Sequence, residues 1–130
     1  MRHGQADFTS PNRWNSPGWG KDLAPLSAEG IRQIQATIDD INNWKPNLVL
    51  ASPMTRALQS ASIVTITLGL ELIVEFDLHE WVPDRSFSWN TLEETLRAQE
   101  DFATCKGEWP LGEERPWETL TSIRNRVQFY

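Results

Sequence analysis

A short apolar run with turn residues on either side constrains the fold of this chain more than any other feature. Leu48–Ala51 contains only apolar residues, and a Lys-Pro-Asn break at 45–47 precedes it. Continuous apolar runs of this length are typical of strands buried within a parallel sheet. Pro53 follows closely, and proline favours the first turn of a helix. The sequence therefore predicts a buried strand that turns directly into a helix.

An amphipathic helix is predicted ahead of this strand, ending at about Trp44. Ser27 is a good N-cap, and Glu29 lies in the positively polarised first turn. The apolar face is formed by isoleucines at three- and four-residue spacing, namely Ile31, Ile34, Ile38 and Ile41. The stretch before this helix, residues 5–25, is rich in proline and glycine, and we expect it to be irregular.

Helices and strands continue to alternate after residue 53. The predicted elements are a helix to about Leu68 that ends at Gly69, a strand over 72–76, a polar helix near 91–104 and a last helix from about Trp117. Alternation of this kind is typical of an α/β fold. We therefore expect a three-layer α/β sandwich with a mostly parallel central sheet.

Composition narrows the class of function. The 130 residues carry a formal net charge of −6 without a basic stripe that could release counterions, so no nucleic-acid partner is expected. No window approaches the roughly 18 apolar residues of a membrane span, so no membrane partner is expected. Cys105 is the only cysteine, which excludes an internal disulfide and favours a cytoplasmic location.

Three groups of residues suit chemistry on phosphate. Arg2-His3-Gly4 opens the chain. Arg56 follows the strand-to-helix turn, and Glu80 comes just after the second predicted strand. A neutral imidazole can attack phosphorus, guanidinium forks can hold the phosphoryl oxygens, and a carboxyl group can protonate the leaving oxygen. Ligands of open α/β sheets bind at the carboxyl ends of strands, where Arg56 is expected.

These groups occur within motifs that resemble the histidine phosphatase superfamily, also called the phosphoglycerate mutase-like family. The motifs are Arg2-His3-Gly4, Leu26-Ser27-x-x-Gly30-x-x-Gln33 and Ser52-x-x-x-Arg56-x-x-x-Ser60-Ala61, in which Ser60 stands where the family usually has threonine. The resemblance implies a nucleophilic His3, whose ring is fixed by backbone at Gly4, and Glu80 as general acid. It also implies that Arg2, Arg56 and Gly4 bind the phosphate. It implies no cofactor and no metal ion.

The resemblance also implies hydrolysis of a phosphorylated small molecule or phosphopeptide through a phosphohistidine on His3. Glu80 is flanked by Trp81 and Val82, so we expect partial desolvation that favours its protonated form. The loop after Gly4 lacks the Ser/Thr and Asn of the mutases, which favours a phosphatase over a sugar-phosphate mutase. The alternatives are such a mutase and an impaired scaffold module that binds phosphate without turnover.

Two parts of the family pattern are missing from this sequence. The family carries a strand ahead of its Arg-His-Gly and a second catalytic histidine after a further strand. Here only Met1 precedes Arg2, and no histidine follows His79. We therefore expect residues 1–130 to form a single incomplete domain, a fragment that lacks both strands and has impaired activity. A naturally short, non-catalytic relative is the alternative.

Overall fold

The computed structural model describes residues 1–14, 18–88 and 91–128 of the chain. The helices are α1 (Thr9–Trp14), α2 (Ala28–Ala36), α3 (Ile38–Asn43), α4 (Thr55–Leu68), α5 (Leu92–Thr104) and α6 (Leu120–Val127), with two 3-10 turns, η1 (Gly18–Leu23) and η2 (Phe76–Leu78). The strands are β1 (Leu48–Ala51) and β2 (Glu71–Val74). Helices and strands therefore alternate from α3 to α5, as the sequence predicts.

β1 and β2 form a parallel two-stranded sheet within the described part of the chain. Leu48 lies opposite Glu71 and Ala51 lies opposite Val74, and α4 connects the two strands. Gly69 follows α4 with a φ of 69° in the left-handed region, where glycine has no steric penalty. The predicted α/β class with a parallel sheet is confirmed.

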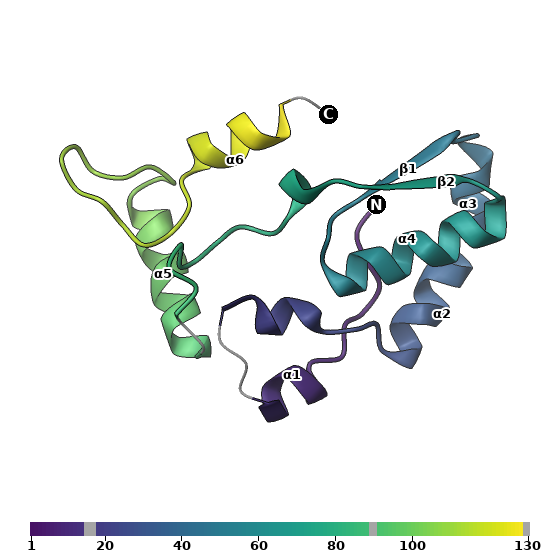
Figure 1. Cartoon of the computed structure of the whole chain (residues 1–130), viewed down its shortest axis with the longest axis horizontal. Helices are drawn as coiled ribbons and strands as arrows, with labels where there is room; N and C mark the ends of the chain where they lie inside the picture. Colours follow the sequence, from purple (N-terminus) through teal and green to yellow (C-terminus); the bar gives the residue numbers. More distant parts are fainter. Residues whose placement is uncertain (15–17, 89–90, 129–130) are drawn as a thin grey trace.

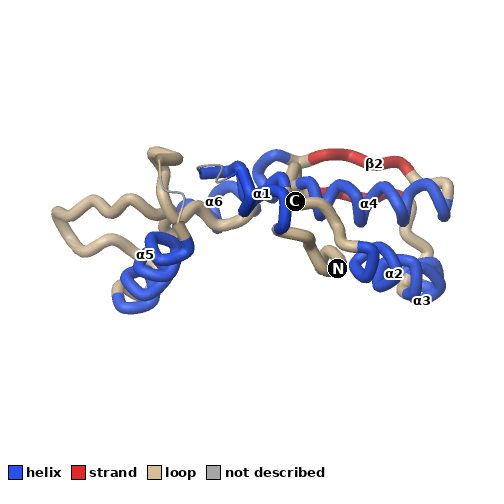
Figure 2. The backbone as a smooth tube through the Cα atoms, turned by 90° about the horizontal axis from the view of Figure 1, so that it is seen from below, coloured by secondary structure: helices blue, strands red, loops and turns tan. Residues whose placement is uncertain are grey.

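Helix α4 lies between the sheet on one side and α2 and α3 on the other, as Figure 2 shows. The core between these helices contains Leu26, Ile34, Ile41 and Val64. Two of these are isoleucines of the predicted apolar face, and their burial attaches α2 and α3 to α4. The hydrophobic effect of this burial stabilises the arrangement, at roughly 1.5–3 kcal/mol for each fully buried large side chain.

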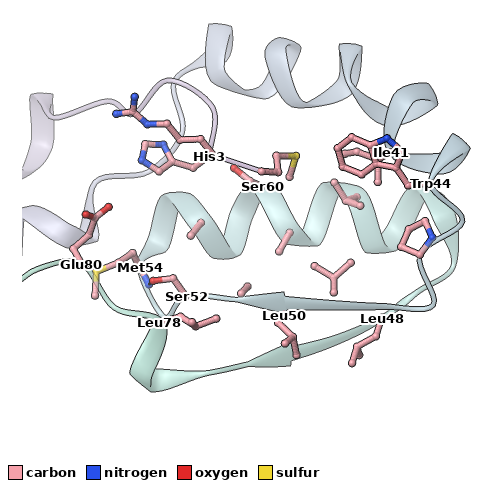
Figure 3. A pocket seen from close by; sticks show the side chains of 18 residues that line it. His3, Ile41, Trp44, Leu48, Leu50, Ser52, Met54, Ser60, Leu78 and Glu80 are labelled. Carbon is pink, nitrogen blue, oxygen red and sulfur yellow. The ribbon is translucent and has the colours of Figure 1, made fainter. Parts of the chain in front are cut away.

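β1 is less buried than the sequence predicts. Only Ala51 is buried, whereas Leu48 and Leu50 are 36% and 43% exposed. The side chains of Leu48 and Leu50 point away from α4 (Figure 3). In the part of the chain that the structure describes, the main contacts of β1 are with β2 and α4. The prediction was wrong because only one face of this sheet is covered by a helix.

The helix predicted up to Trp44 is divided at Thr37. The backbone N–H of Thr37 and its hydroxyl both donate to the carbonyl of Ile34, at 3.0 and 2.8 Å. A threonine hydroxyl that bonds the preceding turn competes with the helical pattern. As a result α2 ends at Ala36, and α3 begins at Ile38.

Residues 5–25 are not irregular throughout, which corrects that prediction. Both α1 and η1 lie in this stretch, and residues 15–17 fall outside the described residues. A carboxylate oxygen of Asp7 accepts a hydrogen bond from the backbone N–H of Thr9 at 2.9 Å, which starts α1 locally. Pro11 is buried in the first turn of α1, where a missing N–H costs nothing.

Helices α5 and α6 lie apart from the α/β layers, at the other end of the molecule (Figure 1). Aromatic residues attach α5 to the loop before α6, because the fully buried Trp117 of that loop meets Phe102 of α5 edge to face with ring centroids 5.2 Å apart. α6 begins at Leu120 rather than near Trp117, because Thr119 caps the helix by accepting from the N–H of Ser122. None of the helices in the described ranges has the length and apolar character needed to cross a membrane.

Candidate active site

The segment that carries His3 is extended and runs alongside the start of α2. The carbonyl of Gln5 accepts from the N–H of Ser27 at 2.9 Å, and the N–H of Gln5 donates to the Gln33 side chain at 2.9 Å. These bonds join both sides of Gln5 to residues of the predicted Leu-Ser-x-x-Gly-x-x-Gln motif. The motif therefore does more than start a helix, because it also fixes the backbone next to His3.

Gly4 and Gly30 meet at this junction. A Cβ added to Gly4 would lie 2.3 Å from the carbonyl oxygen of Gly30, and a Cβ on Gly30 would lie 2.2 Å from the carbonyl oxygen of Gln5. Neither backbone could stay in place against such contacts. Glycine at both positions is therefore required for the close approach of the His3 segment to α2.

Arg56 lies in the first turn of α4, just beyond the carboxyl end of β1, as predicted. Its side chain is only 8% exposed. Ser60, one turn later, donates its hydroxyl to the Arg56 carbonyl at 2.8 Å and accepts from the Gly4 N–H at 3.3 Å. Ser60 therefore links the turn that carries Arg56 to the backbone that carries His3.

The hydrogen bonds of the His3 ring assign its tautomer. Nδ1 lies 2.7 Å from the carbonyl oxygen of Gly4, and a carbonyl can only accept, so Nδ1 carries the proton. Nε2 accepts from the Nε–H of Arg56 at 3.1 Å. In the neutral ring Nε2 therefore holds the lone pair, and this lone pair faces the Arg56 guanidinium.

Two carboxylates accept from the terminal nitrogens of the Arg56 guanidinium. Oδ1 of Asp22 accepts from Nη1 and Nη2 at 3.2 Å each, and Oε1 of Glu80 accepts from Nη2 at 3.1 Å. The sequence analysis missed Asp22. The one feature of the sequence that could have identified Asp22 is its place shortly ahead of the α2 motif. We expected no defined structure in that stretch.

The environment of Asp22 acts on its ionisation. Burial raises the pKa of the Asp22 carboxyl above its usual value of 3.8 and outweighs the opposing effect of the Arg56 charge and hydrogen bonds. The nearby Glu80 carboxylate raises this pKa further, and His79 lowers it slightly. The charged form of Asp22 is thus less favourable here than in water.

A cavity of about 520 Å³ opens beside these residues. Figure 3 shows His3 and Glu80 on opposite sides of one end of the cavity, with Ile41 and Trp44 at the other end. Arg2 also lines the cavity. One end is therefore polar and suits a charged group, whereas the other end is mainly apolar.

Glu80 is more exposed than predicted. Its side chain is 57% exposed, so Trp81 and Val82 do not enclose it. Trp81 instead donates its indole N–H to the carbonyl of Glu118 at 2.8 Å, and its ring packs edge to face against Phe102 of α5. The expected desolvation of Glu80 was wrong, although its carboxylate does lie next to Arg56.

The structure thus brings together His3, Arg56 and Glu80 from three separate segments, with Arg2 and Ser52 on the same cavity. An imidazole lone pair, a guanidinium and a carboxyl group at one end of a cavity can serve as a nucleophile, an anion-binding group and, when the carboxyl group is protonated, a proton donor. Such a set is suited to transfer of a phosphoryl group. The sequence predicted these residues, and the structure adds Asp22 as a further partner of Arg56.

Comparisons with known proteins bear on this arrangement. The sequence model of the histidine phosphatase superfamily (branch 1) matches residues 1–129. The probable phosphoglycerate mutase GpmB of Proteus mirabilis (strain HI4320) is 25% identical over 133 residues, covering 98% of this chain and 58% of that protein. The uncharacterized phosphatase PhoE of Bacillus subtilis (strain 168) is 29% identical over 80 residues, covering 62% of this chain and 39% of that protein.

A solved structure has the same fold. The mycobacterial glucosyl-3-phosphoglycerate phosphatase is 21% identical and matches with a TM-score of 0.67 over 98% of this chain and 57% of that chain. This chain thus spans between 39% and 58% of the length of the two curated relatives. Residues 1–129, which match the family model, contain the candidate site described above.

Proposed function

This chain belongs to branch 1 of the histidine phosphatase superfamily, and from this membership we propose that the protein hydrolyses phosphomonoesters through a phosphohistidine on His3. The observation that carries the proposal is the ring of His3. Its Nδ1 proton is held by the Gly4 carbonyl, and its Nε2 lone pair lies 3.1 Å from the Nε of Arg56. A nucleophile with a fixed tautomer next to a buried cation is the arrangement that attack on an anionic phosphate requires.

In the first step, Nε2 of His3 forms a bond to phosphorus while the bond from phosphorus to the leaving oxygen breaks. Arg56 moves its Nε–H from Nε2 to a phosphoryl oxygen, and Glu80, in its protonated form, gives its proton to the leaving oxygen. In the second step, water attacks phosphorus and gives a proton to Glu80. The electrons of the N–P bond return to Nε2, and inorganic phosphate leaves.

Arg2 is proposed as a second cation for the phosphoryl oxygens, because it lines the same cavity as His3. The substrate is proposed to be a phosphorylated small molecule or a phosphopeptide. The polar end of the cavity would take the phosphate, and the side chains of Ile41 and Trp44 would face the rest of the substrate. The named relatives include both phosphatases and a mutase, so transfer between two positions of a sugar phosphate is the second candidate reaction.

The test measures release of p-nitrophenol from p-nitrophenyl phosphate and binding of orthovanadate by the same protein. We expect weak turnover, because no second catalytic histidine of the family pattern follows His79. His3→Ala should abolish this turnover, and Arg56→Ala should lower it by about 100- to 1000-fold, as loss of one oxyanion donor does. Arg32→Ala is the matched control, because Arg32 lies exposed on α2. Vanadate binding without turnover would favour a scaffold module, and phosphate moved between positions of a sugar phosphate would favour a mutase.

A further inference from the structure

We propose that Asp22 is a positioning residue that aims the Arg56 guanidinium at the reacting phosphate. This inference rests on the proposed function, since it assigns a role within the same site. A guanidinium presents two edges to its partners, an end edge formed by Nη1 and Nη2 and a side edge formed by Nε and one Nη. The two carboxylates next to Arg56 use these edges differently.

Asp22 occupies the end edge. Its Oδ1 accepts from both Nη1 and Nη2 at 3.2 Å. The side edge points to the reacting centre, because Nε donates to Nε2 of His3 at 3.1 Å and Nη2 donates to Oε1 of Glu80 at 3.1 Å. A phosphate placed between His3 and Glu80 would accept from this side edge while Asp22 kept the end edge.

The backbone around Asp22 is held in place. The N–H of Leu26 donates to the Gln59 side chain on α4 at 2.6 Å, and the carbonyl of Pro25 accepts from Asp7 at 2.7 Å. η1 itself contacts α4, and Ala24 is fully buried. Asp22 therefore lies on a segment attached to the same helix that carries Arg56.

Exposure separates the two carboxylates. The side chain of Asp22 is 27% exposed and that of Glu80 is 57% exposed. Glu80 can rotate into water and give way to a phosphoryl oxygen, whereas Asp22 cannot leave without exposing a buried guanidinium edge. Glu80 thus marks a phosphate-oxygen position, and Asp22 keeps the guanidinium oriented once the oxygen has arrived.

Charge supports this assignment. The groups that face Asp22 are Arg56, Glu80 and His79, and burial outweighs their combined effect, so that the pKa of Asp22 is raised. A carboxylate in such a place lowers the stability of the fold in its charged form. The Asp22 carboxylate nevertheless makes two hydrogen bonds to the end edge of Arg56. We therefore assign it a role in orienting the guanidinium and not in stabilising the fold.

The experiment uses the 130-residue chain, with orthovanadate as the phosphate probe. The first measurement is the affinity for orthovanadate, followed by ⁵¹V NMR. The second is the Nε–H resonance of Arg56, which reports the bond to His3 without any ligand. The variants are Asp22→Ala, which removes the acceptor, Asp22→Asn, which keeps an oxygen acceptor without the charge, and Asp40→Asn, a control at an exposed position on α3.

We expect Asp22→Ala to weaken vanadate binding by about 10- to 100-fold, the loss typical of removing a partner that orients a ligand-binding group. It should also shift and broaden the Arg56 Nε–H signal. Asp22→Asn should restore most of both properties, and Asp40→Asn should match the original chain. If Asp22→Ala does not fold, Asp22→Leu takes its place, because leucine keeps the branching at Cγ and has no acceptor.

The outcomes separate this inference from the proposed function. Vanadate binding and an Arg56 signal that are unchanged in Asp22→Ala would overturn the positioning role while the phosphate site stands. A second outcome is that the chain binds no vanadate, while the Arg56 signal is lost in Asp22→Ala and restored in Asp22→Asn. This outcome would overturn the phosphate site and leave the positioning of Arg56 by Asp22 in place. A chain that binds no vanadate, and whose Arg56 signal is unchanged in Asp22→Ala, would overturn both the phosphate site and the positioning role.

Discussion

Gly4 and Gly30 approach so closely that neither position has room for a side chain. A Cβ on Gly4 would lie 2.3 Å from the Gly30 carbonyl oxygen. This contact joins the Arg-His-Gly segment to the first turn of α2, two regions separated by more than twenty residues in the sequence. The position of His3 in the site therefore depends on a glycine in another motif.

We predict that Gly30→Ala destabilises the fold by at least about 1–3 kcal/mol, the usual cost of overpacking. The new methyl group would meet backbone atoms of Gln5 at 2.2 Å, and backbone cannot rotate away as a side chain can. The measurement is the midpoint of urea unfolding. Gly112→Asn is the control, because nothing lies within 4 Å of a Cβ there and asparagine tolerates a positive φ. Equal losses in the two variants would contradict the account.

Ser60→Ala should destabilise the chain by about 1–3 kcal/mol, because it leaves the buried N–H of Gly4 without its acceptor. The same change removes the bond to the Arg56 carbonyl. Since both partners belong to the site, vanadate affinity should fall together with stability. Ser60→Thr keeps the hydroxyl and should retain more of both. A Ser60→Ala protein with unchanged unfolding and binding would show that this link is unimportant.

Glu118 is buried and pairs with the partly buried Arg126; their side chains are 8% and 13% exposed, and Oε1 lies 2.8 Å from Nε. Glu118→Ala should cost about 3–5 kcal/mol, because it leaves Arg126 charged and without this partner. Burial acts to raise the pKa of Glu118, but the hydrogen bonds and charge of Arg126 outweigh it and lower the pKa.

The lowered pKa sets the pH range of this effect. The contribution of Glu118 is present above its ordinary pKa of 4.5 and is lost as the pH falls through the lower value of the folded state. Unfolding free energies of the original chain and of Glu118→Gln should therefore differ at neutral pH and converge in acid. A difference that does not depend on pH would mean that the charge of Glu118 is irrelevant.

Asp22→Asn should show the opposite dependence on pH. The pKa of Asp22 is raised above 3.8, so its contribution to stability is complete below that pH and is lost as the pH rises through the raised value. The asparagine variant should match the original chain in acid and should be the more stable of the two at neutral pH. An Asp22→Asn variant that matches the original chain in acid but is less stable than the original chain at neutral pH would contradict the raised pKa.

Sequence patterns were sufficient for the parts of the fold that depend on local information. The apolar run at Leu48–Ala51 and the left-handed glycine at Gly69 identified β1 and the end of α4. The order of the motifs identified the family, which the match over residues 1–129 confirmed. The break at Thr37 was missed because periodicity does not show that a hydroxyl bonds the preceding turn.

Tertiary contacts account for the other differences between the sequence predictions and the structure. The exposure of Leu48 and Leu50 depends on which elements cover the sheet, and a run of four residues carries no such information. Asp22 was missed for a related reason, since it meets Arg56 from 34 residues away in a stretch with no periodic pattern. The sequence predicted His3, Arg56 and Glu80 by type and spacing, but the exposure of Glu80 depends on the direction of Trp81.

The most direct test of the central claim asks where the phosphate goes. The protein is incubated with ³²P-labelled substrate and quenched in alkali, and the label is located by peptide mapping. The account predicts label on His3 that is stable in alkali and labile in acid, is absent from His3→Ala, and remains in the control Arg32→Ala. Label on a serine or on Cys105, or label that persists in full in His3→Ala, would contradict the account.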